Sequence, residues 1–119
     1  MLTLEWRIWI ERDGQPCFGD GRARLLEAIG RAGSLSGAAR ELEMPYRTAW
    51  QHLESMEQAL GRRLVERQTG GKRGGGTQLT DHGQELLAAY RRLRTALDRA
   101  RDRHVVRFFE ELQGAGPAS

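Results

Sequence analysis

Apolar and polar residues alternate at the start of the chain. The residues on the apolar side are Leu2, Leu4, Trp6, Ile8 and Ile10. Strict alternation is typical of a strand with one buried face, so we predict a half-buried strand over 2–11. The segment RDGQP has turn chemistry and precedes Cys17 and Phe18, which predicts a returning strand. The first element is therefore expected to be a β-hairpin spanning residues 2–18.

From Asp20 onward the apolar residues recur every three or four positions, as on one face of an α-helix. Asp20 is the predicted N-cap of a first helix, and Gly33 is its predicted C-cap. A short second helix follows, with its apolar positions at Leu35, Ala38, Ala39 and Leu42. Pro45 suits the first turn of a third helix over 45–60. The second and third helices meet at the short turn EMP, which predicts a helix-turn-helix over 34–60.

Two short strand candidates, RRLVERQ and TQLT, flank a glycine-rich segment and predict a second hairpin, or wing, over 62–80. Thr80 is the predicted N-cap of a long helix over 81–113, and residues 114–119 are expected to form a frayed tail. The expected fold class is mainly α with small β. It is a winged helix-turn-helix over 1–80, with an N-terminal β-hairpin and a long C-terminal helix.

The apolar positions of the final helix are separated by alternating steps of four and three, as in the seam of a coiled coil. A long helix at the end of a small domain has little of its own chain to cover such a seam. We therefore predict a homodimer, with an inverted-repeat binding site on DNA. The residues predicted to form the dimer contact are Leu86, Tyr90, Leu93, Leu97, Phe108 and Phe109.

The formal net charge is +3, but the positive charge is concentrated in two segments. Residues 61–76 hold five Lys and Arg against one Glu, and residues 91–107 hold seven Arg against two Asp. Binding of an anionic partner requires such a local concentration of positive charge. The second segment, 91–107, is also consistent with the solvated face of a helix. No apolar run approaches the roughly 20 residues that span a bilayer. The start of the chain does not resemble a signal peptide, so a cytoplasmic protein without membrane contact is expected.

The glycine-rich segment 70–76 carries five glycines around Lys72 and Arg73. Glycines let the backbone approach phosphates closely, and the two cations attract them. The predicted DNA contacts of the wing are Arg67, Thr69, Lys72 and Arg73. The spacing argues against a nucleotide-binding loop, because Glu66 stands where that motif requires glycine and Arg73 where it requires Ser or Thr. A flexible, solvated loop remains the alternative.

Two segments resemble the N-terminal winged-helix domain of the molybdate-responsive transcriptional regulators (ModE): LLEAIGRAGSLSGAARELEMPYRTAWQHLESME and LVERQTGGKRGGGTQLTDHGQELL. The first is also similar to the LysR-type helix-turn-helix. The resemblance implies a bacterial transcription regulator that binds double-stranded DNA and needs no cofactor. Full-length members carry molybdate-binding domains after this one, and the chain ends at Ser119 without room for one. Sensing of a molybdate-like oxyanion is therefore not carried over by the resemblance.

The predicted third helix carries further candidate DNA contacts. Arg47 is the first candidate for a base contact, because Arg reads guanine with two hydrogen bonds. Thr48 and Gln51 are the next candidates, and His52 faces either the DNA groove or solvent. Tyr46 is predicted to hydrogen-bond a phosphate, with burial against the first helix as the alternative. Trp50, three residues before Leu53, is predicted to belong to the core.

Ser34 and Ser36 precede or open the predicted second helix. Their ordinary role is to cap that helix, since a serine hydroxyl satisfies the free backbone N–H groups of the first turn. The N-terminus of a helix is also a favourable site for a phosphate, so both serines are candidate DNA contacts as well.

Catalysis and metal binding are not expected. The three histidines, His52, His82 and His104, lie on separate predicted elements without a suitably placed Cys, and no serine stands in a G-x-S-x-G motif. The lone Cys17 is predicted to be a small buried hydrophobe. Two other functions stay open beside DNA binding: a winged-helix module that pairs with another regulator, and a direct oxyanion sensor that uses the glycine-rich segment.

Overall fold

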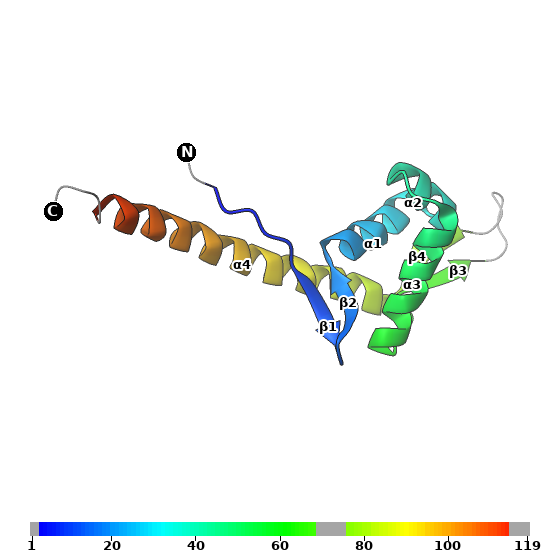
Figure 1. Ribbon diagram of the computed structural model, residues 1–119. Helices are drawn as coiled ribbons and strands as arrows, with labels where there is room; N and C mark the ends of the chain where they lie inside the picture. The colour runs from blue at the N-terminus through cyan, green and yellow to red at the C-terminus, as the bar shows by residue number, and fades with distance from the viewer. Residues whose placement is uncertain (1–2, 69–75, 115–119) are drawn as a thin grey trace. The chain divides into compact units, whose positions relative to one another are not determined.

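The computed structural model describes residues 3–68 and 76–114 (Figure 1). Two compact units are present, one formed by Ile8–Ala88 and the other by Met1–Arg7 together with Ala89–Ser119. The elements in chain order are β1 (Trp9–Arg12), β2 (Gln15–Gly19), α1 (Asp20–Ala32), α2 (Leu35–Glu41), α3 (Tyr46–Leu60), β3 (Val65–Gln68), β4 (Gly76–Leu79) and α4 (Asp81–Gly114). The mainly helical fold with two small sheets is as predicted.

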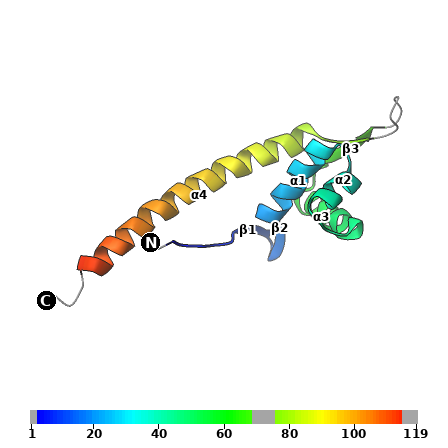
Figure 2. The same cartoon turned by 90° about the horizontal axis from the view of Figure 1, so that it is seen from above.

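Helices α1, α2 and α3 form the core of the larger unit, and Figure 2 shows them grouped together. Their fully buried side chains include Leu25, Leu26, Ile29 and Met56. The predicted ends are largely confirmed. Gly33 and Gly61 close α1 and α3 in the left-handed conformation, which glycine adopts without a Cβ penalty. The N-cap of α1, however, is Gly19, and Asp20 is already the first residue of the helix.

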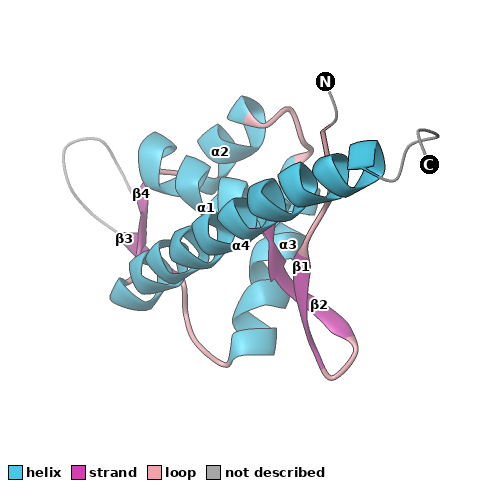
Figure 3. Ribbon diagram, turned by 90° about the vertical axis from the view of Figure 1, so that its left-hand side faces the viewer, coloured by secondary structure: helices cyan, strands magenta, loops and turns pink. Residues whose placement is uncertain are grey.

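The wing is an antiparallel pair of strands, β3 and β4, in which Val65 lies opposite Leu79 (Figure 3). It is fixed to the helical core by backbone hydrogen bonds. The N–H of Thr77 donates to the carbonyl oxygen of Gly33 at 2.7 Å, and the N–H of Thr80 donates to that of Leu64 at 2.9 Å. The helix-turn-helix and the wing therefore belong to one packed unit.

The N-terminal hairpin is shorter than predicted, and the half-buried strand over 2–11 is wrong. Strand β1 covers only Trp9–Arg12, and residues 3–8 form no strand. The reason is the length of the partner, since Trp9 pairs with Gly19 and the next residue, Asp20, already begins α1. Residues 3–8 therefore have no neighbouring strand, and their alternating apolar side chains do not form the face of a sheet. Leu4 and Ile10 are accordingly exposed, whereas Cys17 on β2 is buried as predicted.

Helix α4 ends at Gly114, one residue beyond the predicted end. Thr80 caps its start as predicted, because its hydroxyl oxygen accepts the N–H of Gly83 at 3.1 Å. In the smaller unit, the guanidinium of Arg101 lies over the ring of Trp6, 5.8 Å from its centre. Arg94 and Arg101 both approach the carboxylate of Asp98, at 3.5 and 3.6 Å. The contact between Arg101 and Trp6 joins the first residues of the chain to the second half of α4, whereas the two ion pairs of Asp98 lie within that helix.

Candidate DNA-binding surface

Helix α3 is held against the core by one side only. Ala49, Leu53 and Met56 are buried, and they recur at the spacing of a single helical face. Pro45 precedes the helix with extended backbone angles, and the N–H of Met44 donates to the carbonyl oxygen of Ala39 across the turn from α2. This arrangement turns the opposite side of α3 toward solvent.

The open side of α3 brings together most of the side chains predicted to contact bases. Arg47 and Gln51 are exposed and make no hydrogen bond or ion pair among the described residues, while Thr48 and His52 are half-buried beside them. Tyr46 is 48% exposed, so its burial against α1 is excluded. One guanidinium, one amide and one phenol are thus free to form new hydrogen bonds on a single helical surface.

The surroundings of His52 shift its pKa. Partial burial lowers the pKa of His52, and the neighbouring guanidinium of Arg22 lowers it further. Arg22 itself is held in place by hydrogen bonds to the carbonyl oxygens of Pro16 and Cys17. His52 is therefore biased toward the neutral imidazole, which has one donor and one acceptor.

Ser34 and Ser36 take different positions. The hydroxyl oxygen of Ser34 accepts the N–H of Gly37 at 2.9 Å, which is the predicted capping role. Ser36 lies one residue inside α2 and is exposed. Ser36 is therefore the serine whose hydroxyl is available to an external partner.

Of the residues predicted to contact DNA from the wing, Arg67 is the one that lies among the described residues. Arg67 lies on β3 and is exposed. Thr69, Lys72 and Arg73 lie outside the described residues. The antiparallel pairing of Arg67 with Thr77 joins the two strands that flank the glycine-rich segment in the sequence.

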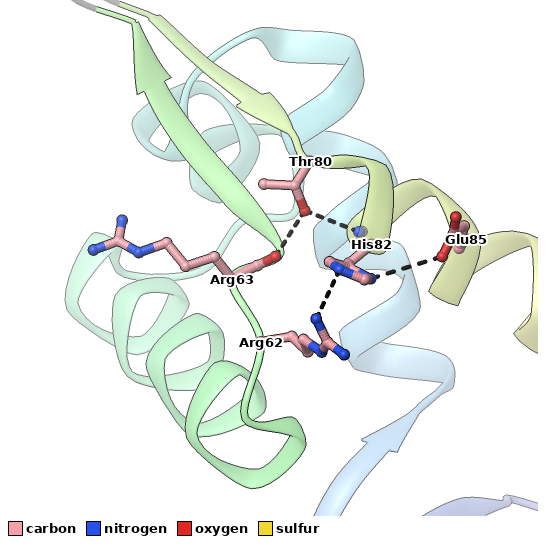
Figure 4. Close-up of polar contacts among 6 residues, drawn as sticks. Arg62, Arg63, Thr80, His82 and Glu85 are labelled. Atoms are coloured by element: carbon pink, nitrogen blue, oxygen red, sulfur yellow. Dashed lines mark hydrogen bonds and ion pairs between the residues drawn. The ribbon is translucent and has the colours of Figure 1, made fainter.

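The connection from α3 to the wing is fixed by polar contacts that the sequence did not disclose. One carboxylate oxygen of Glu57 accepts the N–H groups of Leu64 and Val65 at 2.8 and 3.4 Å. The guanidinium of Arg62 lies 3.1 Å from Nε2 of His82, whose Nδ1 is 3.7 Å from Glu85 (Figure 4). The carbonyl oxygen of Arg63 accepts the hydroxyl of Thr80 at 2.7 Å. Together these contacts set the direction of the wing relative to α3.

Trp50 is not a core residue, contrary to the prediction, because 44% of it is exposed. Each residue of a helix is rotated by about 100° from the one before, so Trp50 points well away from the buried Ala49. Its spacing of four residues from the exposed Tyr46 was the signal that places it on the open side. Sequence reasoning also passed over Arg63, whose exposed side chain lies near Trp50 around a groove of about 470 Å³.

The predicted dimer residues differ in exposure within the single chain. Tyr90 is buried, and Leu86 and Leu97 are half-buried. Leu93, Phe108 and Phe109 are 40%, 58% and 39% exposed, so they present uncovered apolar surface along α4. Dimer formation through these residues stays a prediction.

Within residues 3–68 and 76–114, no group of three or more His, Cys, Asp or Glu side chains is placed to hold a metal ion. Among the same residues, no helix is long and apolar enough to cross a membrane.

A helix-turn-helix followed by a two-stranded wing and a further helix defines the winged helix-turn-helix class. Residues 21–84 match the family described as bacterial regulatory helix-turn-helix protein, lysR family. The chain belongs to this family and carries a DNA-binding helix-turn-helix of the LysR and ModE type. Because the family consists of transcriptional regulators, the expectation that the chain is not an enzyme is confirmed.

Similar proteins include a molybdenum transport protein and a transcriptional regulator, both named ModE. The chain is 42% identical over 101 residues to the molybdenum transport protein ModE of Azotobacter vinelandii, covering 82% of this chain and 37% of that protein. It is 48% identical over 69 residues to the transcriptional regulator ModE of Haemophilus influenzae, covering 58% of this chain and 27% of that protein. The chain thus spans about a third of the length of these relatives, and the resemblance to ModE is confirmed over that part.

Solved structures show the same fold. The DNA-binding domain of CbnR, in its complex with DNA, superposes with a TM-score of 0.56 at 26% identity, covering 72% of this chain and 93% of that one. ArgP from Mycobacterium tuberculosis superposes with a TM-score of 0.52 at 25% identity, covering 68% of this chain and 28% of that one. The winged helix-turn-helix assignment therefore has support from both sequence and structure.

Proposed function

We propose that the chain is a sequence-specific, DNA-binding transcription regulator of bacterial type that binds an inverted repeat as a homodimer. The observation that carries the proposal is the open side of α3, where Arg47 and Gln51 are exposed without partners among the described residues. A helix of this kind fits the major groove, where each base pair presents a distinct pattern of donors and acceptors. A cytoplasmic location goes with this role.

The proposed contacts divide into two groups. Arg47, Thr48 and Gln51 read base edges, and neutral His52 adds one donor or acceptor beside them. Phosphates are held by Tyr46, Ser36, Arg67 and the wing residues Thr69, Lys72 and Arg73, with Ser34 capping the N-terminus of α2. The first group sets sequence preference, and the second sets affinity and its dependence on salt.

The second copy is expected to pack on the apolar seam of α4. Leu93, Phe108 and Phe109 expose apolar area that is costly to leave in water. Burial of these residues with the half-buried Leu86 and Leu97 against an equivalent helix removes that cost, whereas Tyr90 is already buried within the single chain. Two copies related by a twofold axis present two α3 helices, which requires two half-sites in inverted orientation.

The names of the relatives suggest the process that is regulated. The Azotobacter protein is described as a molybdenum transport protein and the Haemophilus protein as a transcriptional regulator. We extend to this chain a role in transcription connected with molybdenum transport. Such a role would make a molybdate-like oxyanion the effector to test first.

Selection of bound sequences from random duplex DNA tests the proposed function. The expected result is an enriched motif with inverted symmetry, because each copy of α3 reads one half-site. A Thr48→Ala, Gln51→Ala double variant is expected to shift or weaken the motif, whereas an Arg24→Ala variant on the exposed surface of α1 should reproduce it. A pool without any motif would contradict sequence reading and would favour a module that pairs with another regulator.

A further inference from the structure

The groove beside Trp50 is formed between the second half of α3 and the segment Gly61–Arg63. Trp50, with 44% of its surface exposed, and Leu53 are the two apolar side chains in the lining. The remaining lining residues are polar, charged or glycine. A groove lined mostly by polar and charged side chains suits a polar, extended ligand better than the apolar side of a protein helix.

The two arginines of the groove have different roles. Arg62 turns toward His82, with 3.1 Å between its guanidinium nitrogen and Nε2. Arg63 points away from that cluster (Figure 4), and its guanidinium makes no hydrogen bond or ion pair among the described residues. Its backbone is fixed, because its carbonyl oxygen accepts the hydroxyl of Thr80. Arg63 is thus a positioned and unpaired cation at the groove.

The acidic residues of the groove limit what the ligand can be. Glu57 is engaged, since one of its oxygens accepts two backbone N–H groups. Glu54 is half-buried and makes no contact of this kind among the described residues, so it repels an anion and attracts a cation. Its removal therefore has opposite effects on an anionic and on a cationic ligand, which makes Glu54 a test of the ligand's charge.

We propose that this groove receives the sugar–phosphate backbone of one DNA strand, with Trp50 packed on a deoxyribose and Arg63 paired with the adjoining phosphate. The proposal rests on the proposed function, because it uses the DNA held by α3. Trp50 follows Tyr46 by one helical turn, at the edge of the open side that carries Arg47 and Gln51. Side chains at such an edge meet the backbone of the DNA, whereas those at the centre meet the bases.

Replacement of each residue has its own expected signature. Trp50→Ala should weaken binding to all duplexes about tenfold without changing the salt dependence, because about 50–60 Å² of apolar contact is lost. Arg63→Ala should lower the salt slope of binding by about 0.9, the value for one phosphate contact. Glu54→Gln should strengthen DNA binding, whereas a basic peptide in the groove would be bound more weakly. The matched control is Trp9→Ala, since Trp9 is 59% exposed but lies on β1.

Fluorescence of Trp50 gives a direct measurement. The chain has three tryptophans, Trp6, Trp9 and Trp50, so a Trp6→Phe, Trp9→Phe variant reports on Trp50 alone. Acrylamide quenching of its emission is measured with and without a duplex chosen by selection, while the anisotropy of a labelled duplex confirms saturation. We expect the quenching constant to fall in the complex. An unchanged constant at saturation would overturn the proposal.

The binding constant of Trp50→Ala in the parent chain provides an independent test, should the doubly substituted chain fold poorly. If the parent binds a selected motif and Trp50→Ala binds it equally well, the groove proposal is wrong while the proposed function stands. If the parent binds no duplex at all, the proposed function itself fails. The two failures are therefore distinguishable.

Discussion

Gly83 lies in the first turn of α4, directly against the backbone of Leu64. A Cβ added at Gly83 would overlap the carbonyl oxygen of Leu64 and lie within 3.3 Å of its carbonyl carbon. That same oxygen accepts the N–H of Thr80 at 2.9 Å, so the overlap falls on a hydrogen bond that joins the base of the wing to α4. Gly83→Ala therefore forces the two segments apart.

The cost can be estimated from these contacts. Overpacking of this kind costs about 1–3 kcal/mol, and we expect the upper half of that range because the obstacle is backbone rather than a flexible side chain. For 119 residues, the unfolding entropy is about 0.25 kcal/mol per degree, so a loss of about 2–3 kcal/mol lowers Tm by about 8–12 °C. The same shift moves the wing and should weaken DNA binding at a temperature where the variant is still folded.

Thermal unfolding followed by circular dichroism measures this effect. Gly21→Ala is the matched control, because a Cβ at Gly21 meets no atom within 4 Å and alanine favours the helix by about 0.5 kcal/mol. We expect the control to melt slightly above the parent and Gly83→Ala well below it. Equal melting temperatures for the parent and Gly83→Ala would refute the described packing of α4 on Leu64.

Three further predictions follow from the same contacts. Glu57→Ala should cost about 1–3 kcal/mol in urea unfolding, because two backbone N–H groups lose their acceptor, whereas Glu54→Ala should be nearly neutral. The pKa of His52 is lowered in the folded chain, so protonation of this imidazole opposes folding. The contribution of His52 to the free energy of unfolding is complete above pH 6.5, the ordinary pKa of histidine, and declines as the pH falls toward the lowered pKa. His52→Gln should flatten the loss of stability on acidification, and an unchanged pH profile would contradict this. Leu93→Asp and Phe108→Asp should shift sedimentation toward a monomer, while Val106→Asp, equally exposed but outside the predicted seam, should leave the dimer intact.

The helices were predictable because their signals are local. The caps at Gly33, Gly61 and Thr80 and the break before Pro45 depend on residues within one turn of each other. Strand β1 was not predictable in its length, because a strand extends only as far as its partner does. Strand β2 ends at Gly19, since α1 begins at the next residue, and nothing in the alternation of residues 2–11 reveals that limit.

The candidate surface was predictable in part. The exposure of Arg47 and Gln51 follows from helical periodicity, because they lie opposite Ala49, Leu53 and Met56. The spacing of three residues between Trp50 and Leu53 predicts a core position for Trp50, but its rotation about the helix axis from the buried Ala49 places it outside.

The role of Arg63 was hidden for another reason. The position of Arg63 depends on Glu57 holding the chain after α3 and on Thr80 bonding its carbonyl oxygen. Thr80 is seventeen residues away from Arg63 in the sequence. No local pattern reports a contact over that separation, so only the folded chain shows which arginine is left unpaired beside α3.

The central claim is that α3 reads base sequence, and Arg47→Ala tests it most directly. The parent and the variant are each titrated with a selected duplex and with duplexes carrying every base pair at each position of one half-site. We predict that the variant loses about 1–3 kcal/mol of discrimination at one base pair and keeps it elsewhere, while Arg24→Ala matches the parent. An Arg47→Ala variant with the parent's preference at every position would contradict the claim.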